Sequence, residues 1–156
     1  MKTVKYTSNE LKSKLKNKTL TIGSWITIPS TEIVEVLSTA GFEWLVIDLE
    51  HTSITLSEAK SLIQTIQANG MNALVRVSSN NETEIKKVLD IGANGIIVPM
   101  IKSKEEIEKA VSFTQYPPNG MRGVGLNRVH KYGTAFKEYK ESSKSEIVVI
   151  AQIEDI

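Results

Sequence analysis

Short apolar runs recur along the chain between residues 19 and 114, each followed by a polar turn and a segment of helical period. A further apolar run comes after a longer irregular stretch. Val and Ile fill these runs almost continuously, which is typical of parallel strands that helices bury on both faces. The predicted strands are LTIGSWI (20–26), WLVIDL (44–49), NALVRV (72–77), GIIVPM (95–100) and EIVVIAQIE (146–154).

The segments between these runs carry signals for the start and end of helices. Thr55 and Ser103 each stand three residues before a glutamate, which is the capping-box pattern. Ser30 is a plausible N-cap, and glycines follow several of the segments. The expected helices cover about residues 30–39, residues 55–70, residues 82–92 and a segment that begins after Ser103, with an additional N-terminal helix over about residues 8–17.

Strand, helix and strand follow one another at intervals of 23 to 28 residues, which predicts right-handed βαβ units. A doubly wound sheet and a (β/α)8 barrel both fit this order. No GxGxxG motif or P-loop follows the first strand, which removes the commonest nucleotide-binding reasons for a doubly wound sheet. We expect one domain over residues 1–156, with Leu11 and Leu15 of the N-terminal helix covering one end of a barrel.

Polar residues whose side chains could bind a ligand or take part in catalysis gather where the predicted strands end. Because parallel α/β folds place ligands at the carboxyl ends of their strands, we expect a site at this edge. His51 stands three residues after Asp48, so that a carboxylate could orient the imidazole. Arg76 interrupts an apolar run and needs an anionic partner. The strand-end residues are Trp25, Asp48, Glu50, His51, Arg76, Gln152 and Glu154.

Each of these residues also has a purely structural interpretation. Asp48 and Glu50 could cap the following helix, and a single histidine is more often structural than catalytic. Arg76 could pair with a nearby carboxylate instead of a ligand. Glu154 could face solvent, and Trp25 could be part of the packing at the rim of the sheet. The clustering of the set at one edge favours the functional interpretation.

The segment from Tyr116 to Gly125, YPPNGMRGVG, combines a Pro-Pro turn with an arginine between glycines. Proline fixes the backbone, while glycine lets the chain approach a ligand or another backbone closely. The structural interpretation is a surface loop with Arg122 in solvent. Taken alone, the segment does not choose between these interpretations.

Composition narrows the classes of function. Lys and Arg number 19 and Asp and Glu number 18, so no electrostatic partner such as nucleic acid or an anionic membrane is expected. No cysteine is present, so any metal would need oxygen or imidazole ligands. The N-terminal stretch lacks the apolar core of a secretory signal, and no apolar run reaches the ~18 residues of a membrane span. We therefore expect a cytoplasmic protein.

Five segments in unbroken order resemble the HpcH/HpaI aldolases. Residues 41–51, GFEWLVIDLEH, resemble that family's "GFDWLLIDxEH" segment, and residues 74–77, LVRV, fall at its "VVR" strand. Residues 89–100 resemble its "LDxGAxGIxVPM" segment. Residues 116–125 resemble its "YPPxGxRGxG" loop, and residues 152–154 resemble its "QIE" strand end. Such a series is far more specific than any single motif.

The resemblance implies a (β/α)8 TIM barrel of the phosphoenolpyruvate/pyruvate type. Members of the family are class II aldolases, which are carbon–carbon lyases that need a divalent metal, Mg²⁺ or Mn²⁺. They cleave a 4-hydroxy-2-oxo acid to pyruvate and an aldehyde. Full-length members typically form homo-oligomers. The partners implied are thus small molecules, with no nucleic acid and no membrane.

The resemblance also implies roles for individual residues. Glu154 would be a metal ligand, and Arg76 would bind the carboxylate or enolate oxygen of pyruvate. His51, oriented by Asp48, would perform the acid–base steps through a bound water or hydroxide. The remaining residues that would line the substrate site are Trp25 and Gln152.

The chain also departs from the family pattern. It ends two residues after Glu154, and five strands are visible where a barrel of about 250 residues has eight. The family's second metal carboxylate, an Asp in a "GPxDLS" segment, is absent. We therefore expect a barrel truncated after its fifth strand that is inactive alone, although half of a two-chain enzyme also fits. Citrate-lyase-like or other enolate-forming chemistry and a non-catalytic interaction domain remain alternatives.

Overall fold

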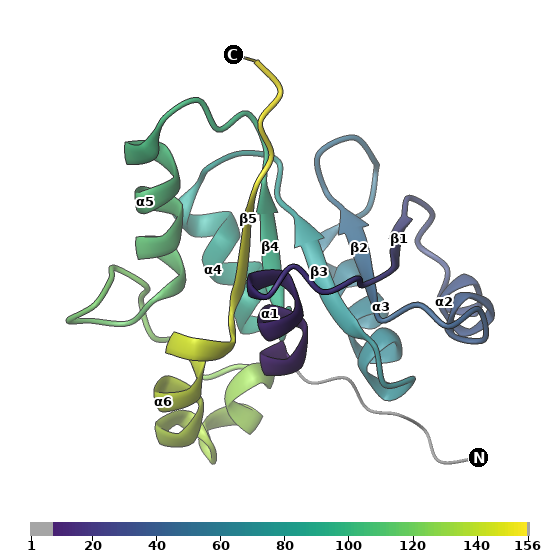
Figure 1. Cartoon of the computed structure of the whole chain (residues 1–156). Coiled ribbons are helices and arrows are strands. Elements are labelled where there is room, and N and C mark those ends of the chain that lie inside the picture. Colours follow the sequence, from purple (N-terminus) through teal and green to yellow (C-terminus); the bar gives the residue numbers. More distant parts are fainter. Residues whose placement is uncertain (1–7, 156) are drawn as a thin grey trace.

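A computed structural model describes residues 8–155, including the side chains of residues 10–155. Five strands form one parallel sheet, and their order across the sheet is their order along the chain (Figure 1). This confirms the predicted parallel α/β class. The strands are β1 (Gly23–Ile26), β2 (Trp44–Asp48), β3 (Asn72–Arg76), β4 (Gly95–Val98) and β5 (Val148–Ala151).

The predicted helices are present and begin at their predicted caps. Ser30 Oγ accepts the backbone N–H of Ile33, and Thr55 forms a complete capping box with Glu58. These caps satisfy N–H groups that the first helical turn leaves without partners. The helices are α1 (Ser8–Lys16), α2 (Thr31–Ser38), α3 (Leu56–Ala68), α4 (Glu82–Asp90) and α5 (Lys104–Thr114).

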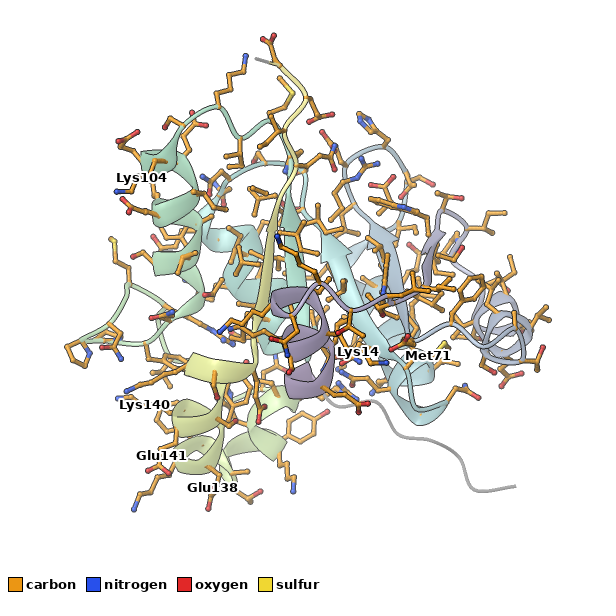
Figure 2. All side chains as sticks on the ribbon, in the orientation of Figure 1. Lys14, Met71, Lys104, Glu138, Lys140 and Glu141 are labelled. Carbon is orange, nitrogen blue, oxygen red and sulfur yellow. The ribbon has the colours of Figure 1, made fainter. Side chains whose placement is uncertain are left out.

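The stretch before β5 is more regular than predicted. It contains a 3₁₀ helix, η1 (Arg128–Gly133), and an α-helix, α6 (Phe136–Glu146). The sequence of α6, FKEYKESSKSE, has few apolar residues, and Ala135 at its N-cap makes no side-chain hydrogen bond. Glu138 and Glu141 of α6 project away from the sheet (Figure 2). Without an apolar stripe or a cap, the sequence carries no signal that would predict this helix.

Alternate residues of the strands pack into separate layers on the two faces of the sheet. One face, which includes Leu45 and Ile47, packs against α2, α3, α4 and α5. The opposite face, which includes Val46 and Leu74, packs against Leu11 of α1. A doubly wound sheet would reverse its strand order and carry crossover helices on both faces. Successive βα units on a single face are instead the arrangement found in a (β/α) barrel.

The face with Val46 and Leu74 is the inner face of the sheet. Helix α1 lies across it near the amino ends of the strands (Figure 1). Leu11 is buried there. Lys12 Nζ donates a hydrogen bond of 2.7 Å to the carbonyl oxygen of Ile147, the residue directly before β5. Lys14, labelled in Figure 2, pairs with Glu43 directly before β2. Leu15 is 39% exposed, so it does not share the buried position of Leu11. The carboxyl ends of the strands thus lie away from this helix.

Arg122 is buried, not exposed to solvent as the surface-loop interpretation expected. Its Nη2 lies 2.7 Å from Asp90 Oδ1, and its Nη1 donates to Tyr139 Oη at 3.0 Å. The guanidinium also lies over the rings of Tyr116 and Tyr139. The glycine-rich loop is therefore anchored to the end of α4 and to α6.

No helix within residues 8–155 has the length and apolar character needed to cross a membrane.

Asn72 is an unusual residue of the inner face. It is 1% exposed, and neither atom of its amide group has a hydrogen-bond partner among the described residues. Leaving a buried polar group without a partner costs about 1–3 kcal/mol. The unpaired amide of Asn72 is therefore expected to lower the free energy of unfolding.

Replacing Asn72 with Leu, which has a similar branched shape, is expected to raise the free energy of unfolding by about 1 kcal/mol, because it removes the unpaired amide. Urea denaturation followed by circular dichroism measures the change, with exposed Asn119→Leu as the control. A loss of stability in Asn72→Leu would show that the amide has a partner, such as an ordered water.

Replacing Arg122 with Met is expected to lower the free energy of unfolding by about 3–5 kcal/mol, since it leaves Asp90 as an uncompensated buried charge. Adding Asp90→Asn to Arg122→Met should recover most of that loss. The two variants are compared by urea denaturation at pH 7. A loss below about 1 kcal/mol for Arg122→Met would contradict the anchoring role.

Candidate active site

The strand-end residues singled out from the sequence come together at the carboxyl edge of the sheet. Asp48 is the last residue of β2 and Arg76 the last of β3, and the two are register partners. The chain leaving β5 brings Gln152 to within 3.4 Å of Arg76. The ring of Trp25 of β1 lies against the same guanidinium. Arg76 is thus the centre of the cluster.

Arg76 and Asp48 form a bidentate ion pair. Arg76 Nε donates to Asp48 Oδ1 at 2.9 Å, and Nη2 donates to Oδ2 at 2.7 Å. The side chains are 14% and 3% exposed. Asp48 Oδ1 also accepts the backbone N–H groups of Glu50 and His51, at 3.0 and 3.3 Å. Asp48 therefore fixes both the arginine and the turn that follows β2.

The environment stabilises the charged forms of both partners. Burial alone raises the pKa of Asp48, but the hydrogen bonds from Arg76, Glu50 and His51 outweigh burial and hold that pKa below its ordinary value. The hydrogen bonds to Asp48, followed by the charges of Asp48, Glu50 and Glu154, raise the pKa of Arg76 despite its burial. The pair is ionised at neutral pH.

Arg76 keeps hydrogen-bonding capacity for a ligand. Its guanidinium carries five N–H groups. Two bind Asp48, and one Nη1 N–H donates to Gln152 Oε1 at 3.4 Å. The guanidinium carbon lies 4.6 Å from the centroid of the Trp25 ring, a cation–π contact that helps fix its plane. Two N–H groups therefore have no hydrogen-bond partner among residues 8–155 and can bind an oxyanion.

Glu50 belongs to this cluster, as its position at the strand end predicted, although the resemblance assigned it no role. Its Oε2 is buried, has no hydrogen-bond partner in the described part of the chain, and lies 3.3 Å from Arg76 Nε. Its Oε1 lies 3.6 Å from His51 Nε2. Buried carboxylate oxygens without partners are rare and indicate a ligand, an ion or water that completes them. Its place between Asp48 and His51 at the strand end was the available signal.

His51 is positioned differently from expectation. Asp48 binds the backbone N–H of His51, while the imidazole lies beside Glu50 and its side chain is 67% exposed. The physical reason is that Arg76 engages both oxygens of Asp48. The exposed ring lies next to the cluster, where it remains accessible to a substrate.

Glu154 extends from the end of β5 to the turn after β4. Its Oε2 accepts the backbone N–H of Met100 at 2.9 Å. A hydrogen bond from the Gln152 side chain, the Met100 N–H, and the positive charge of Arg76 with the nearby His51 lower the pKa of Glu154. Gln152 thereby connects Glu154 to Arg76, so the cluster is one continuous network.

The charge of the cluster fits a divalent cation. Three carboxylates, those of Asp48, Glu50 and Glu154, surround the one guanidinium of Arg76, so their formal charges sum to −2. Within residues 8–155, no group of three ligating side chains converges on one point. Mg²⁺ nevertheless commonly binds through one or two carboxylates and completes its shell with water and substrate oxygens. Glu154 fits such a ligand in chemistry and position.

Two cavities bear on where a ligand could bind. One of 320 Å³ is lined by Ser78, Pro99 and Met100 and borders the turn that binds Glu154. Another, of 340 Å³, is lined by Gly92 and Arg128, among other residues, beside the amino ends of β4 and β5. Of these two, the first is the one lined by a residue, Met100, that binds a member of the strand-end cluster.

Comparison with known sequences agrees with this geometry. The family model described as HpcH/HpaI aldolase/citrate lyase matches residues 21–155. A 2-dehydro-3,6-dideoxy-6-sulfogluconate aldolase of Pseudomonas putida is 36% identical over 90% of this chain and 55% of its own length. A hydroxypyruvate/pyruvate aldolase of Sagittula stellata is 34% identical over 94% of this chain and 58% of its own.

Solved structures agree with the sequence relatives. An HpcH/HpaI aldolase/citrate lyase family protein from Burkholderia cenocepacia superposes with a TM-score of 0.88 and 30% identity over 94% of this chain and 60% of that one. A citrate synthase superposes with a TM-score of 0.80 and 34% identity, over 93% of this chain and 56% of that one. The chain thus spans little more than half the length of the proteins it matches.

Replacing Asp48 with Asn is expected to lower the free energy of unfolding by about 3 kcal/mol at pH 7, since Arg76 loses its buried partner. The folded-state pKa of Asp48 is lowered, so its contribution is complete above the unfolded-state value of about 3.9. That contribution disappears as the pH falls through the lower folded-state pKa. Urea denaturation from pH 7 to pH 2 measures the difference.

Exposed Asp155→Asn is the control, and it should change stability little at any of these pH values. A difference between the wild type and Asp48→Asn that persists undiminished at the acid end would contradict this account of the ion pair.

Proposed function

Because the chain belongs to the HpcH/HpaI aldolase/citrate lyase family, we propose that it carries part of the active site of a carbon–carbon lyase. The reaction is retro-aldol cleavage of a 4-hydroxy-2-oxo acid to pyruvate and an aldehyde, within a (β/α)8 barrel. The observation that carries this proposal is Arg76, which Asp48 holds rigidly and which has two N–H groups free at the carboxyl edge of the sheet.

Arg76 binds the carboxylate or the enolate oxygen of the pyruvate unit. Planar guanidinium N–H groups match the two oxygens of such an anion, and Asp48 and Trp25 keep the plane from rotating. Gln152, whose amide is held between Arg76 and Glu154, lines the same space. Because these groups are fixed before substrate arrives, little reorganisation opposes the reaction.

Glu154 is proposed as a ligand of the divalent cation, Mg²⁺ or Mn²⁺. When bound, such a cation supplies a Lewis acid that stabilises negative charge on the 2-oxo oxygen. The cation also offsets the net negative charge of the cluster, which otherwise repels an anionic substrate. Glu50, whose Oε2 accepts no hydrogen bond from the described residues, supports the same site from the β2 side.

His51 is proposed to move the proton of the 4-hydroxyl group, directly or through a water. In cleavage the imidazole accepts this proton, the bond between C3 and C4 breaks, and its electron pair passes into the pyruvate enolate. The imidazolium then returns this proton to C3, directly or through a water, which gives pyruvate. Glu50 Oε1, 3.6 Å from His51 Nε2, stabilises the imidazolium formed in the first step. Asp48 contributes by holding the backbone of the turn.

A related reaction is the second candidate. The structural likeness to a citrate synthase indicates that similar scaffolds form carbon–carbon bonds in citrate. Cleavage or synthesis of a citrate-like acid needs the same stabilisation of an enolate by Arg76 and a cation. The two candidates differ in the acid produced, so the identity of the released 2-oxo acid distinguishes them.

Binding of Mn²⁺ and pyruvate is the direct test. Mn²⁺ titration followed by electron paramagnetic resonance should show affinity about 10-fold or more weaker in Glu154→Gln than in the wild type. Pyruvate binding in the presence of Mn²⁺, followed by calorimetry, should weaken at least about 10-fold in Arg76→Lys, since lysine loses the planar donor pair.

The matched controls are Glu141→Gln, on the exposed side of α6, and Arg128→Lys, near the amino ends of the strands. Both should bind Mn²⁺ and pyruvate like the wild type. Turnover is then assayed by reducing released pyruvate with lactate dehydrogenase. Wild-type protein that binds no pyruvate, with or without metal, would contradict the proposal.

A further inference from the structure

Met100, directly after Pro99 at the end of the β4 segment, has a left-handed backbone with φ of 55°. Residues other than glycine adopt this region at a cost, and Asn and Asp do so more easily than Met. The Met100 side chain is 49% exposed, so its packing does not account for the conformation. Strained backbone of this kind concentrates at functional sites, where surrounding interactions maintain it.

The conformation directs backbone N–H groups at the segment that follows β5. The N–H of Met100 donates to Glu154 Oε2 at 2.9 Å, and the N–H of Ile101 donates to the Gln152 carbonyl at 3.1 Å. The N–H of Gln152 in turn donates to the Val98 carbonyl at 2.9 Å. Three hydrogen bonds thus join residues 98–101 to residues 152–154.

We propose that Met100 is a positioning residue, whose left-handed backbone fixes the Glu154 carboxylate relative to Arg76. The Gln152 side chain also hydrogen-bonds to Glu154 and is itself hydrogen-bonded to Arg76. The carboxylate is therefore held by a backbone N–H and by a side-chain amide. Its orientation is set before any ligand binds. The unfavourable backbone conformation of Met100 is what maintains that orientation.

This inference rests on the proposed role of Glu154 in the active site. If Glu154 binds a divalent cation, the Met100 N–H is the group behind the ligand that keeps its oxygen in place. Such outer groups change metal affinity by about 10- to 100-fold when they are lost. The side chain of Met100 is not required, because the backbone provides the contact.

Two substitutions separate backbone conformation from side-chain identity. Val is β-branched and disfavours the left-handed region, whereas Asn tolerates it. Met100→Val should bind Mn²⁺ about 10-fold more weakly than the wild type, and Met100→Asn should bind within about twofold of it. Met121→Val, at an exposed methionine in the loop after α5, is the control and should have no effect. Equal Mn²⁺ affinity in Met100→Val and Met121→Val would overturn the inference.

A measurement without metal distinguishes failure of the positioning role from failure of the proposed function. In ¹H–¹⁵N spectra of the whole chain, the Met100 amide should exchange slowly with solvent and should shift in Glu154→Gln. The same amide should keep its wild-type shift in Glu141→Gln. If the wild type binds no Mn²⁺, the proposed metal role fails, and the amide spectra alone then decide the positioning role. A Met100 amide that exchanges freely or ignores Glu154→Gln overturns it.

Discussion

The ion pair between Asp48 and Arg76 is the constraint on which the rest of the site depends. It joins the last residues of β2 and β3, so the hydrogen-bond register of the sheet places the two groups side by side. Buried ion pairs contribute little net stability, because desolvation offsets their attraction. The pair instead sets the orientation of the groups around it. It fixes the plane of the guanidinium, and through Asp48 it fixes the turn that carries Glu50 and His51.

The two ends of the sheet have different physical characters. Near the amino ends, α1 covers the inner face with Leu11, and the loop after α5 is anchored through Arg122. At the carboxyl ends, the largely buried carboxylates of Asp48 and Glu50 and the exposed side chains of His51 and Glu154 make the cluster around Arg76. Stabilising packing is therefore concentrated at one end and the candidate chemistry at the other, which is the usual division in folds built from βα units.

Much of this arrangement follows from the sequence by simple physical rules. Continuous Val and Ile runs predicted the strands, and Thr55 with Glu58 predicted where α3 begins. Strand-end positions predicted that Asp48 and Arg76 would meet, because parallel strands share a carboxyl edge. These features depend on local pattern and on topology, both of which can be read along the chain.

Other features depend on contacts between distant segments, and the sequence could not supply them. Arg122 is buried because Asp90, far away in the sequence, lies beside it. His51 lies beside Glu50 because Arg76 has already engaged both oxygens of Asp48. Helix α6 lacks an apolar stripe, so its packing against η1 and α1, not its own pattern, accounts for it. In each case a tertiary partner decides between local alternatives.

The contact between Trp25 and Arg76 has a consequence for observing the protein. Indole emission responds to a cation at its face, and Trp25 is partly open to solvent, 4.6 Å from the arginine at the centre of the cluster. The other tryptophan, Trp44, lies near the opposite end of the sheet, with its indole N–H donating to Thr21. The fluorescence of Trp25 is therefore expected to change when a ligand binds to the Arg76 guanidinium.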